Sequence, residues 1–214
     1  MHLEILSDQQ RELLPLISRF KRSFYLAGGT AIALHIGHRH SIDFDLFTEK
    51  KLHKTRMRKI VFETSYEKQT LFDDVDQAHF YVNGVKLTFL QYPYPVQSPE
   101  KLENIISMPS LLSLAAMKAF ALGRRAKWKD YVDLYFLLNG YFSVCEISTE
   151  AKQIFGELFS EKLFRMQLAF HKDLDYSEPV EYISGFEVDE QVIQDFLISK
   201  SVQNSPGTAR ARLP

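Results

Sequence analysis

A strand that turns through two adjacent glycines into a helix constrains this sequence more than any other feature. Residues 24–27, Phe-Tyr-Leu-Ala, are apolar and read as a strand. Gly28 and Gly29 then allow a tight turn, and Thr30 is a candidate cap for the helix that begins at Ala31. Amides at a helix N-terminus bind phosphate, and a turn without side chains lets a phosphate approach closely. We therefore expect the amides of the two glycines and of Thr30, together with the Thr30 hydroxyl, to bind a nucleotide phosphate.

A second motif follows at residues 41–47, Ser-Ile-Asp-Phe-Asp-Leu-Phe. Its period of two predicts a strand with Asp43 and Asp45 on one face, Ser41 beside them as a hydroxyl donor to the nucleotide, and apolar residues on the other face. The residues expected to point into the core are Ile42, Phe44 and Leu46. Two neighbouring carboxylates repel each other unless they hold a cation, and carboxylate oxygens suit Mg²⁺ or Mn²⁺. Opposite the glycine turn, this pair predicts a metal–nucleotide site.

Composition narrows the class of protein. The 214 residues are 45% hydrophobic, enough to bury the core of one domain or of two small lobes. The net charge of −1 does not indicate a globally basic nucleic-acid binder, so any basic surface must be local. The single cysteine, Cys145, excludes a disulfide framework or a cysteine-rich zinc module and is expected to be a small buried apolar residue. With no apolar segment long enough for a bilayer and no signal core, we expect a cytoplasmic protein without a membrane partner.

The first 95 residues mix helices and strands. Helices are expected over residues 7–20 and 50–67, and the second of these is basic. Residues 78–82 and 85–90 flank Asn83-Gly84, which is the strongest short signal for a β-hairpin. An antiparallel pair makes a purely parallel sheet an unsuitable description, so we predict an α/β (α+β) lobe with a mixed sheet over residues 1–95.

The pattern changes after residues 92–95, Tyr-Pro-Tyr-Pro, where two prolines end the strand. We predict a helical lobe over residues 96–200 and a loose, disordered tail over 201–214. The signals used for its helices are Pro109 as an opening residue, Gly123 as a breaker, helical patterns over 127–138, 149–159, 161–171 and 189–199, and Ser148 as a cap.

Three segments together resemble a known family. Residues 24–31 (FYLAGGTA), 37–47 (GHRHSIDFDLF) and 127–134 (KWKDYVDL) resemble the AbiEii/AbiGii toxins, nucleotidyltransferase-like proteins of the DNA polymerase β type, and the similarity extends over roughly residues 10 to 200. The resemblance implies a polymerase β-type lobe, a helical C-terminal lobe and an active site in the cleft between them. It also implies a toxin of a toxin–antitoxin or phage-defence system that transfers a nucleotide from an NTP to RNA (tRNA among the candidates) or to a protein, with a cognate antitoxin as a possible partner.

The resemblance adds two residues to the expected catalytic set of Asp43 and Asp45. Lys118 is the cation implied to hold the nucleotide phosphates, and Asp130 is the acid that follows a basic stretch. Transferases of this type usually carry a third carboxylate on a neighbouring strand, and the matching position here is Thr88. Threonine is a poor metal ligand and no base near neutral pH. Either Asp130 takes over that role or the transfer activity is weakened, and the sequence leaves both open.

Other groups have two interpretations each. The basic run with Arg124, Arg125 and Lys127 fits either a solvated helix end or an RNA-binding patch in which Trp128 stacks on bases. Lys118 fits either the phosphate role or a helix lysine whose ammonium reaches solvent. Asp130 and Asp133 share a helix face and fit surface ion pairs with nearby cations, Asp133 more readily than Asp130.

The histidines at 35, 38 and 40 invite a zinc hypothesis, but no HExxH motif is present and Gly37 interrupts the helix between the first two. His38 and Arg39 are instead expected to position the aspartate loop or to contact phosphate. Two other functional classes stay open at this point: a non-catalytic nucleotide- or partner-binding protein on the same fold, and a phosphotransferase that moves the γ-phosphate.

Overall fold

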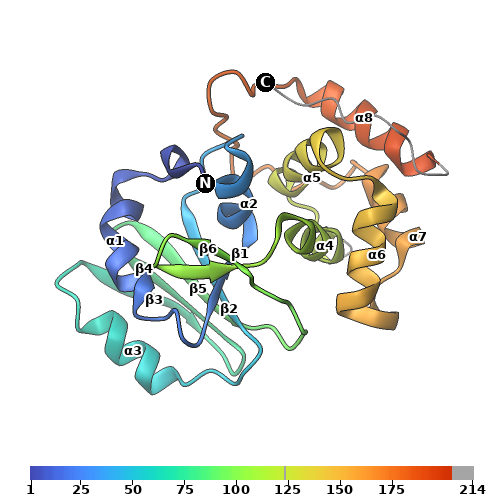
Figure 1. Ribbon diagram of the computed structural model, residues 1–214. Coiled ribbons are helices and arrows are strands. Elements are labelled where there is room, and N and C mark those ends of the chain that lie inside the picture. The colour runs from blue at the N-terminus through green and yellow to red at the C-terminus, as the bar shows by residue number, and fades with distance from the viewer. Residues whose placement is uncertain (123, 204–214) are drawn as a thin grey trace. The chain divides into compact units, whose positions relative to one another are not determined.

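The computed structural model describes residues 1–122 and 124–203 and divides the chain into two compact units, Met1–Ser110 and a second unit that begins at Leu111 (Figure 1). The sequence placed this boundary at residue 95. Residues expected to be helical instead form a two-stranded sheet, β6 (Glu100–Leu102) with β7 (Ile106–Met108), which belongs to the first unit. Gly123 and residues 204–214, most of the expected tail, lie outside the described residues.

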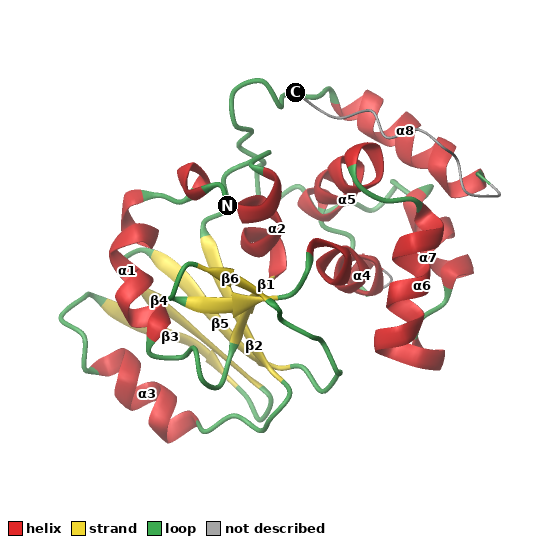
Figure 2. Cartoon of the chain, viewed as in Figure 1, coloured by secondary structure: helices red, strands yellow, loops and turns green. Residues whose placement is uncertain are grey.

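The first unit is built on a mixed five-stranded sheet with strand order β1-β2-β5-β4-β3 (Figure 2). The strands are β1 (Tyr25–Ala27), β2 (Asp43–Thr48), β3 (Lys68–Asp73), β4 (Gln77–Val82) and β5 (Val85–Gln91). Strands β2 and β5 are parallel, and the other neighbours are antiparallel. The predicted mixed sheet is therefore confirmed. Strand β3 was missed because its central residues are exposed and show no alternation.

The predicted hairpin is confirmed at β4 and β5. Asn83 and Gly84 occupy the turn with φ values of 50° and 75°, the left-handed pair that a two-residue type I′ turn requires. The hairpin places alternate residues of both strands on the same face of the sheet.

Helices pack on the apolar face of this sheet. The helical segments of the unit are η1 (Leu3–Ile5), α1 (Asp8–Ser18), α2 (Gly28–Ile36) and α3 (Lys54–Phe62). Phe20, just after α1, contacts Phe89 of β5 with ring centroids 4.8 Å apart, and Phe62 of α3 contacts Phe80 of β4 at 6.3 Å. Helix α3 is shorter than the predicted 50–67. Ile42 precedes β2 and is 67% exposed, so its expected place in the core was wrong.

The second unit is helical, as predicted. Its helices are α4 (Leu111–Leu122), α5 (Trp128–Gly140), α6 (Val144–Phe155), η2 (Gly156–Leu158), α7 (Glu161–Leu168) and α8 (Glu190–Val202). Helix α6 starts earlier than expected because Ser143 caps it in a reciprocal capping box with Glu146, whereas Ser148 is buried inside the helix. The expectation of a buried Cys145 was wrong, because the first turn of α6 exposes it. None of the helices in the described ranges is long and apolar enough to cross a membrane.

Candidate functional site

The glycine turn lies directly against one of the two carboxylates. Ala27 of β1 is the antiparallel partner of Asp45 in β2, and Gly28 follows it at the first position of α2 with φ +70°. A Cβ atom on Gly28 would lie 2.0 Å from Asp45 Oδ2. Both the backbone conformation and the space therefore require glycine here. The structure thus brings together the two motifs that the sequence analysis singled out.

The strand β2 holds both carboxylates on one face. Phe44 and Leu46 are fully buried on the opposite face, which fixes the orientation of Asp43 and Asp45 by simple alternation. In the parallel pairing with β5, Asp45 is the partner of Thr88. Threonine thus occupies the strand position next to Asp45 at which the family resemblance predicts a third acid.

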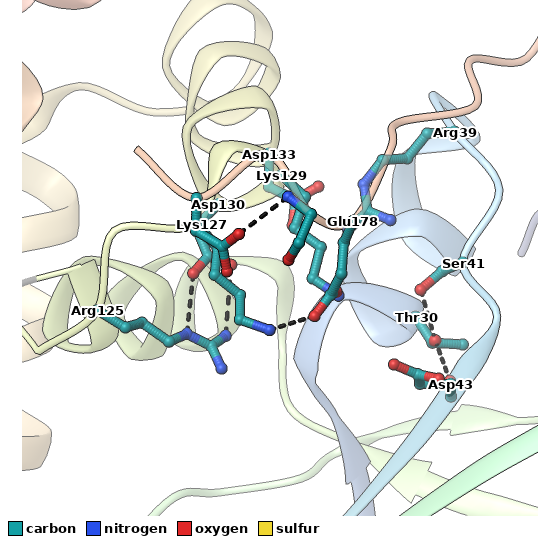
Figure 3. Close-up of polar contacts among 12 residues, drawn as sticks. Thr30, Arg39, Ser41, Asp43, Arg125, Lys127, Lys129, Asp130, Asp133 and Glu178 are labelled. Atoms are coloured by element: carbon teal, nitrogen blue, oxygen red, sulfur yellow. Dashed lines mark hydrogen bonds and ion pairs between the residues drawn. The ribbon is translucent and has the colours of Figure 1, made fainter. Parts of the chain in front are cut away.

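Thr30 has a different role from the one predicted. Ala27, not Thr30, is the N-cap of α2, and Thr30 is 1% exposed within the first turn. Its hydroxyl contacts the backbone carbonyl of Asp43 and lies 2.8 Å from Ser41 Oγ (Figure 3). Because the single proton of Thr30 goes to the carbonyl, the Ser41 hydroxyl is the donor between the two side chains. These bonds fix the start of the aspartate strand to the glycine helix, so binding of phosphate through the Thr30 hydroxyl is not supported.

Two residues on the same face were missed. Lys86 is the β5 partner of Asp43, and His79 of β4 is the partner of Thr88. His79 Nε2 lies 3.2 Å from Gln77 Oε1. Burial lowers the pKa of His79 and the charge of Lys86 lowers it further, although Asp45 acts in the opposite sense.

The lowered pKa favours the neutral form of His79, which lies on the strand next to Thr88. The period of two in the predicted hairpin strands was the signal that could have placed these residues on the carboxylate face.

Lys118 is at the centre of a buried ion cluster in the second unit. Its Nζ lies 2.7 Å from Asp130 Oδ1 and 2.9 Å from Asp133 Oδ2, and the lysine is 5% exposed while both aspartates are 0% exposed. Arg125 Nε contacts the other oxygen of Asp130 at 2.9 Å. Burial by itself raises the pKa of Asp130, but the charges of Lys118 and Arg125 outweigh it and hold this pKa below its usual range. Lys118 does not reach solvent, and the two aspartates are buried and not at the surface, so these interpretations were wrong; Asp130 does pair with Arg125, one of the nearby cations expected for it.

The lysines of the basic run form internal ion pairs. Lys127 and Lys129 both contact the carboxylate of Glu178, and Figure 3 shows the Lys127 pair. Burial by itself raises the pKa of Glu178, whereas its hydrogen bonds to the two ammonium groups lower it to about 2. These cations already have an anionic partner within their own unit.

The remaining members of the run also have internal contacts. The Trp128 ring is 8% exposed and stacks on Tyr176 with centroids 5.5 Å apart, so its expected availability for stacking on RNA bases was wrong. The Arg124 guanidinium lies 4.0 Å from the centre of the Phe120 ring. This arrangement does not favour the RNA-patch interpretation of residues 124–129.

The histidines contact separate backbone carbonyls. His35 Nε2 lies 3.3 Å from the Pro109 oxygen, and His40 Nδ1 lies 3.1 Å from the Ile5 oxygen. His38 and Arg39 are buried, in agreement with a positioning role, which stays a prediction. Within the described ranges, no three His, Cys, Asp or Glu side chains are grouped to hold a metal ion.

The sequence of the chain matches a known protein family. The pattern of the family described as nucleotidyl transferase AbiEii toxin, type IV toxin–antitoxin system, matches residues 16–200. This chain belongs to the AbiEii family. It is therefore a nucleotidyltransferase and a toxin of the type IV class, which was the first of the functional classes that the sequence left open.

Individual proteins are similar to this chain in sequence or in fold. An uncharacterised protein of Aquifex aeolicus (strain VF5) is 32% identical over 197 residues, covering 89% of this chain and 88% of its own. The nucleotidyltransferase toxin MenT4 of Mycobacterium tuberculosis H37Rv has the same fold, with a TM-score of 0.59 at 13% identity, covering 90% of this chain and 80% of that one. JHP933 of Helicobacter pylori gives a TM-score of 0.55 at 18% identity, with 92% and 91% covered.

Proposed function

We propose that this AbiEii protein transfers a nucleotide from an NTP to an RNA or protein acceptor with the help of Mg²⁺ or Mn²⁺. The observation that supports the proposal is the contact between the Gly28 backbone and the Asp45 carboxylate, with Asp43 on the same face of the strand. Anion-binding amides and cation-binding carboxylates then lie side by side, as a metal–triphosphate complex requires.

The donor set fits the proposed metal. Mg²⁺ is usually held by one or two carboxylates, with substrate phosphates and water completing its ligands. Asp43 and Asp45 supply two carboxylates, and Thr88 beside them supplies no third. When bound, such an ion would compensate the negative charge of the triphosphate.

The residues of the chain would then orient the reactants. The amides of residues 28–30 would hold the phosphates, while the hydrogen bonds of the Thr30 hydroxyl, accepted from Ser41 and donated to the Asp43 carbonyl, keep the carboxylates in place. An acceptor oxygen would attack the α-phosphorus, the bond from that phosphorus to the bridging oxygen would break, and pyrophosphate would leave. The acceptor proton needs a base. The family resemblance implies Asp130 for this role and Lys118 as the phosphate-binding cation, and both roles stay predictions because the two side chains are buried in one ion cluster.

Position-specific labelling tests the proposal. Each NTP is supplied with label at the α- or γ-phosphate, together with Mg²⁺ and either total tRNA or a protein extract, and the parent is compared with Asp43→Asn. We expect α-label in the acceptor and a loss of at least about a hundredfold in the variant, because one carboxylate of two is removed. Asp76→Asn, on an exposed turn of the same unit, is the matched control and should keep full activity. Transfer of γ-label alone, or equal labelling by Asp43→Asn, contradicts the proposal.

The family also implies a cognate antitoxin. Type IV toxin–antitoxin membership supports such a partner for this chain, and we propose that the toxin is encoded beside it. Co-expression of the neighbouring gene should relieve the growth arrest that the parent toxin causes.

A further inference from the structure

A cavity of about 210 Å³ in the first unit is lined by an unusual concentration of positive charge. It lies where α1, the end of β2 and the start of α3 meet. The basic side chains around it are Arg19, Lys50, Lys51, His53 and Arg56. None of the described residues that line it is acidic. We call this cavity the basic pocket.

The cations on and before α3 fall into two groups. Lys54 and Arg58, one turn apart, both pair with Asp73 of β3, Lys54 at 2.5 Å. The lysines at 50 and 51 and Arg56 have no ion-pair partner in the part of the chain that the structure describes. Asp73 therefore compensates one of the two positive charges on that side of the segment, whereas within the described ranges the charges of Lys50, Lys51 and Arg56 have no such partner at the basic pocket. Arg19 alone among the lining cations is paired, with Glu63 at 2.7 Å.

The first turn of α3 adds partial positive charge to the basic pocket. The helix starts at Lys54, and its N-cap residue His53 makes no side-chain hydrogen bond to the free amides. Uncapped amides at a helix start carry partial positive charge and accept an anion. The backbone and the side chains at the basic pocket thus favour the same kind of ligand.

The size of the pocket and the sequence around it define that ligand further. Sites that enclose a whole small molecule usually measure about 300–1,000 Å³, so the basic pocket has room for one group of a larger ligand. Residues 50–59 contain six Lys or Arg and no Asp or Glu, although the whole chain has a net charge of −1. A continuous basic segment suits an extended polyanion better than an isolated anion.

We propose that the basic pocket binds a backbone phosphate of an RNA strand, at a site separate from the Asp43–Asp45 face. The further statement that this RNA is the acceptor of the nucleotide rests on the proposed function. Thr48, which lines the pocket, points to the opposite face of β2 from the two aspartates, because it alternates with them along the strand. The predicted patch at 124–129 has its lysines paired with Glu178, whereas Lys50, Lys51 and Arg56 of the pocket have no ion-pair partner among the described residues.

Binding of RNA without turnover tests the inference. The probe is a fluorescein-labelled single-stranded RNA of about 12 nucleotides, within the length that one single-strand-binding module covers, titrated by anisotropy in EDTA without NTP. Each phosphate contact to a single strand contributes about 0.7 to the slope of log K against log salt, or about fourfold in affinity at 0.15 M salt. Lys50→Gln with Arg56→Gln should therefore weaken binding more than tenfold and reduce the slope by about 1.4.

The matched control removes the same number of charges from the same basic segment. Lys54→Gln with Arg58→Gln loses two cations that share the Asp73 carboxylate and do not line the basic pocket, so we expect a change of less than about twofold. Thermal unfolding establishes that both double variants are folded. Equal affinity of Lys50→Gln/Arg56→Gln and parent, equal losses in the two double variants, or competition by poly-glutamate as strong as that by RNA would overturn the inference.

The two proposals fail separately. Asp43→Asn should lose α-label transfer and keep RNA binding, because it does not line the basic pocket. If RNA binding depends on Asp43 and not on Lys50 and Arg56, the pocket is not the RNA site, and the proposed transfer reaction is unaffected.

Discussion

Replacing Gly28 with alanine tests the contact on which the candidate site depends. The added methyl group meets the Asp45 carboxylate at 2.0 Å, and ordinary contact begins at 3.4 Å, so the carboxylate must move by about 1.4 Å. A misplacement of about 1 Å in a catalytic group costs roughly a hundredfold in rate. We expect Gly28→Ala to lose at least that factor in nucleotide transfer.

The same substitution has a second cost that needs its own control. Alanine at φ +70° is strained by about 1–2 kcal/mol, which lowers the melting temperature of a unit of this size by roughly 5–10 °C. Gly84 has φ +75° in the β4–β5 turn, and a Cβ atom there meets nothing within 4 Å. Gly84→Ala therefore carries the same backbone strain without the contact to Asp45.

The comparison of the two alanine variants gives the result. Melting temperatures from circular dichroism should fall by similar amounts, while α-label transfer, assayed well below both melting temperatures, should fall only in Gly28→Ala. If the two variants retain the same activity, the position of the Asp45 carboxylate does not matter to the reaction, and our interpretation of the site is refuted.

Three further predictions concern charge. Lys118→Ala removes the ammonium that two buried carboxylates share. Urea unfolding followed by the fluorescence of the single tryptophan should therefore show a loss of about 3–5 kcal/mol in the free energy of unfolding, and a loss below about 1 kcal/mol would contradict the cluster. The pKa of Glu178 is lowered from 4.5 to about 2, so its stabilising contribution is present above pH 4.5 and is lost as the pH falls toward 2. Glu178→Gln should therefore make the free energy of unfolding depend less on pH between these values. An unchanged pH dependence would show that the pairs with the two lysines do not stabilise the fold. Thr88→Asp places a second negative charge beside Asp45, which should lower the free energy of unfolding by about 0.2–1 kcal/mol in EDTA. Because the added carboxylate can bind the metal, Mg²⁺ should raise the melting temperature of this variant more than that of the parent.

The parts of the fold that local sequence specifies were predictable. The Asn83-Gly84 turn needs only its own two residues and the alternating strands beside it, and the helical unit shows ordinary amphipathic patterns. Strand β3 was not predictable, because it pairs at a sheet edge with exposed side chains that carry no pattern. The β6–β7 pair was missed because three-residue strands are too short for a periodic signal.

The candidate site divides in the same way. The meeting of Gly28 with Asp45 follows from two short motifs on neighbouring strands, and both were visible in the sequence. The partners of Lys118 and of Trp128 were not, because they depend on how helices pack across many residues. The spacing of residues along a helix predicts which of them share a face. It does not predict which side chains of other helices pack against that face.

The neutral balance around Lys118 restricts how this region of the protein can vary. Two carboxylates, one ammonium and one guanidinium compensate one another there, three of them away from solvent. Substituting one of these residues alone leaves an opposite charge buried without its partner, which is strongly destabilising. Substitutions that keep the protein folded must therefore change both partners together. A single variant of this group that loses activity can therefore have lost the folded structure of the helical unit and not a catalytic group. Replacing a carboxylate and its cationic partner together by neutral residues separates the two effects.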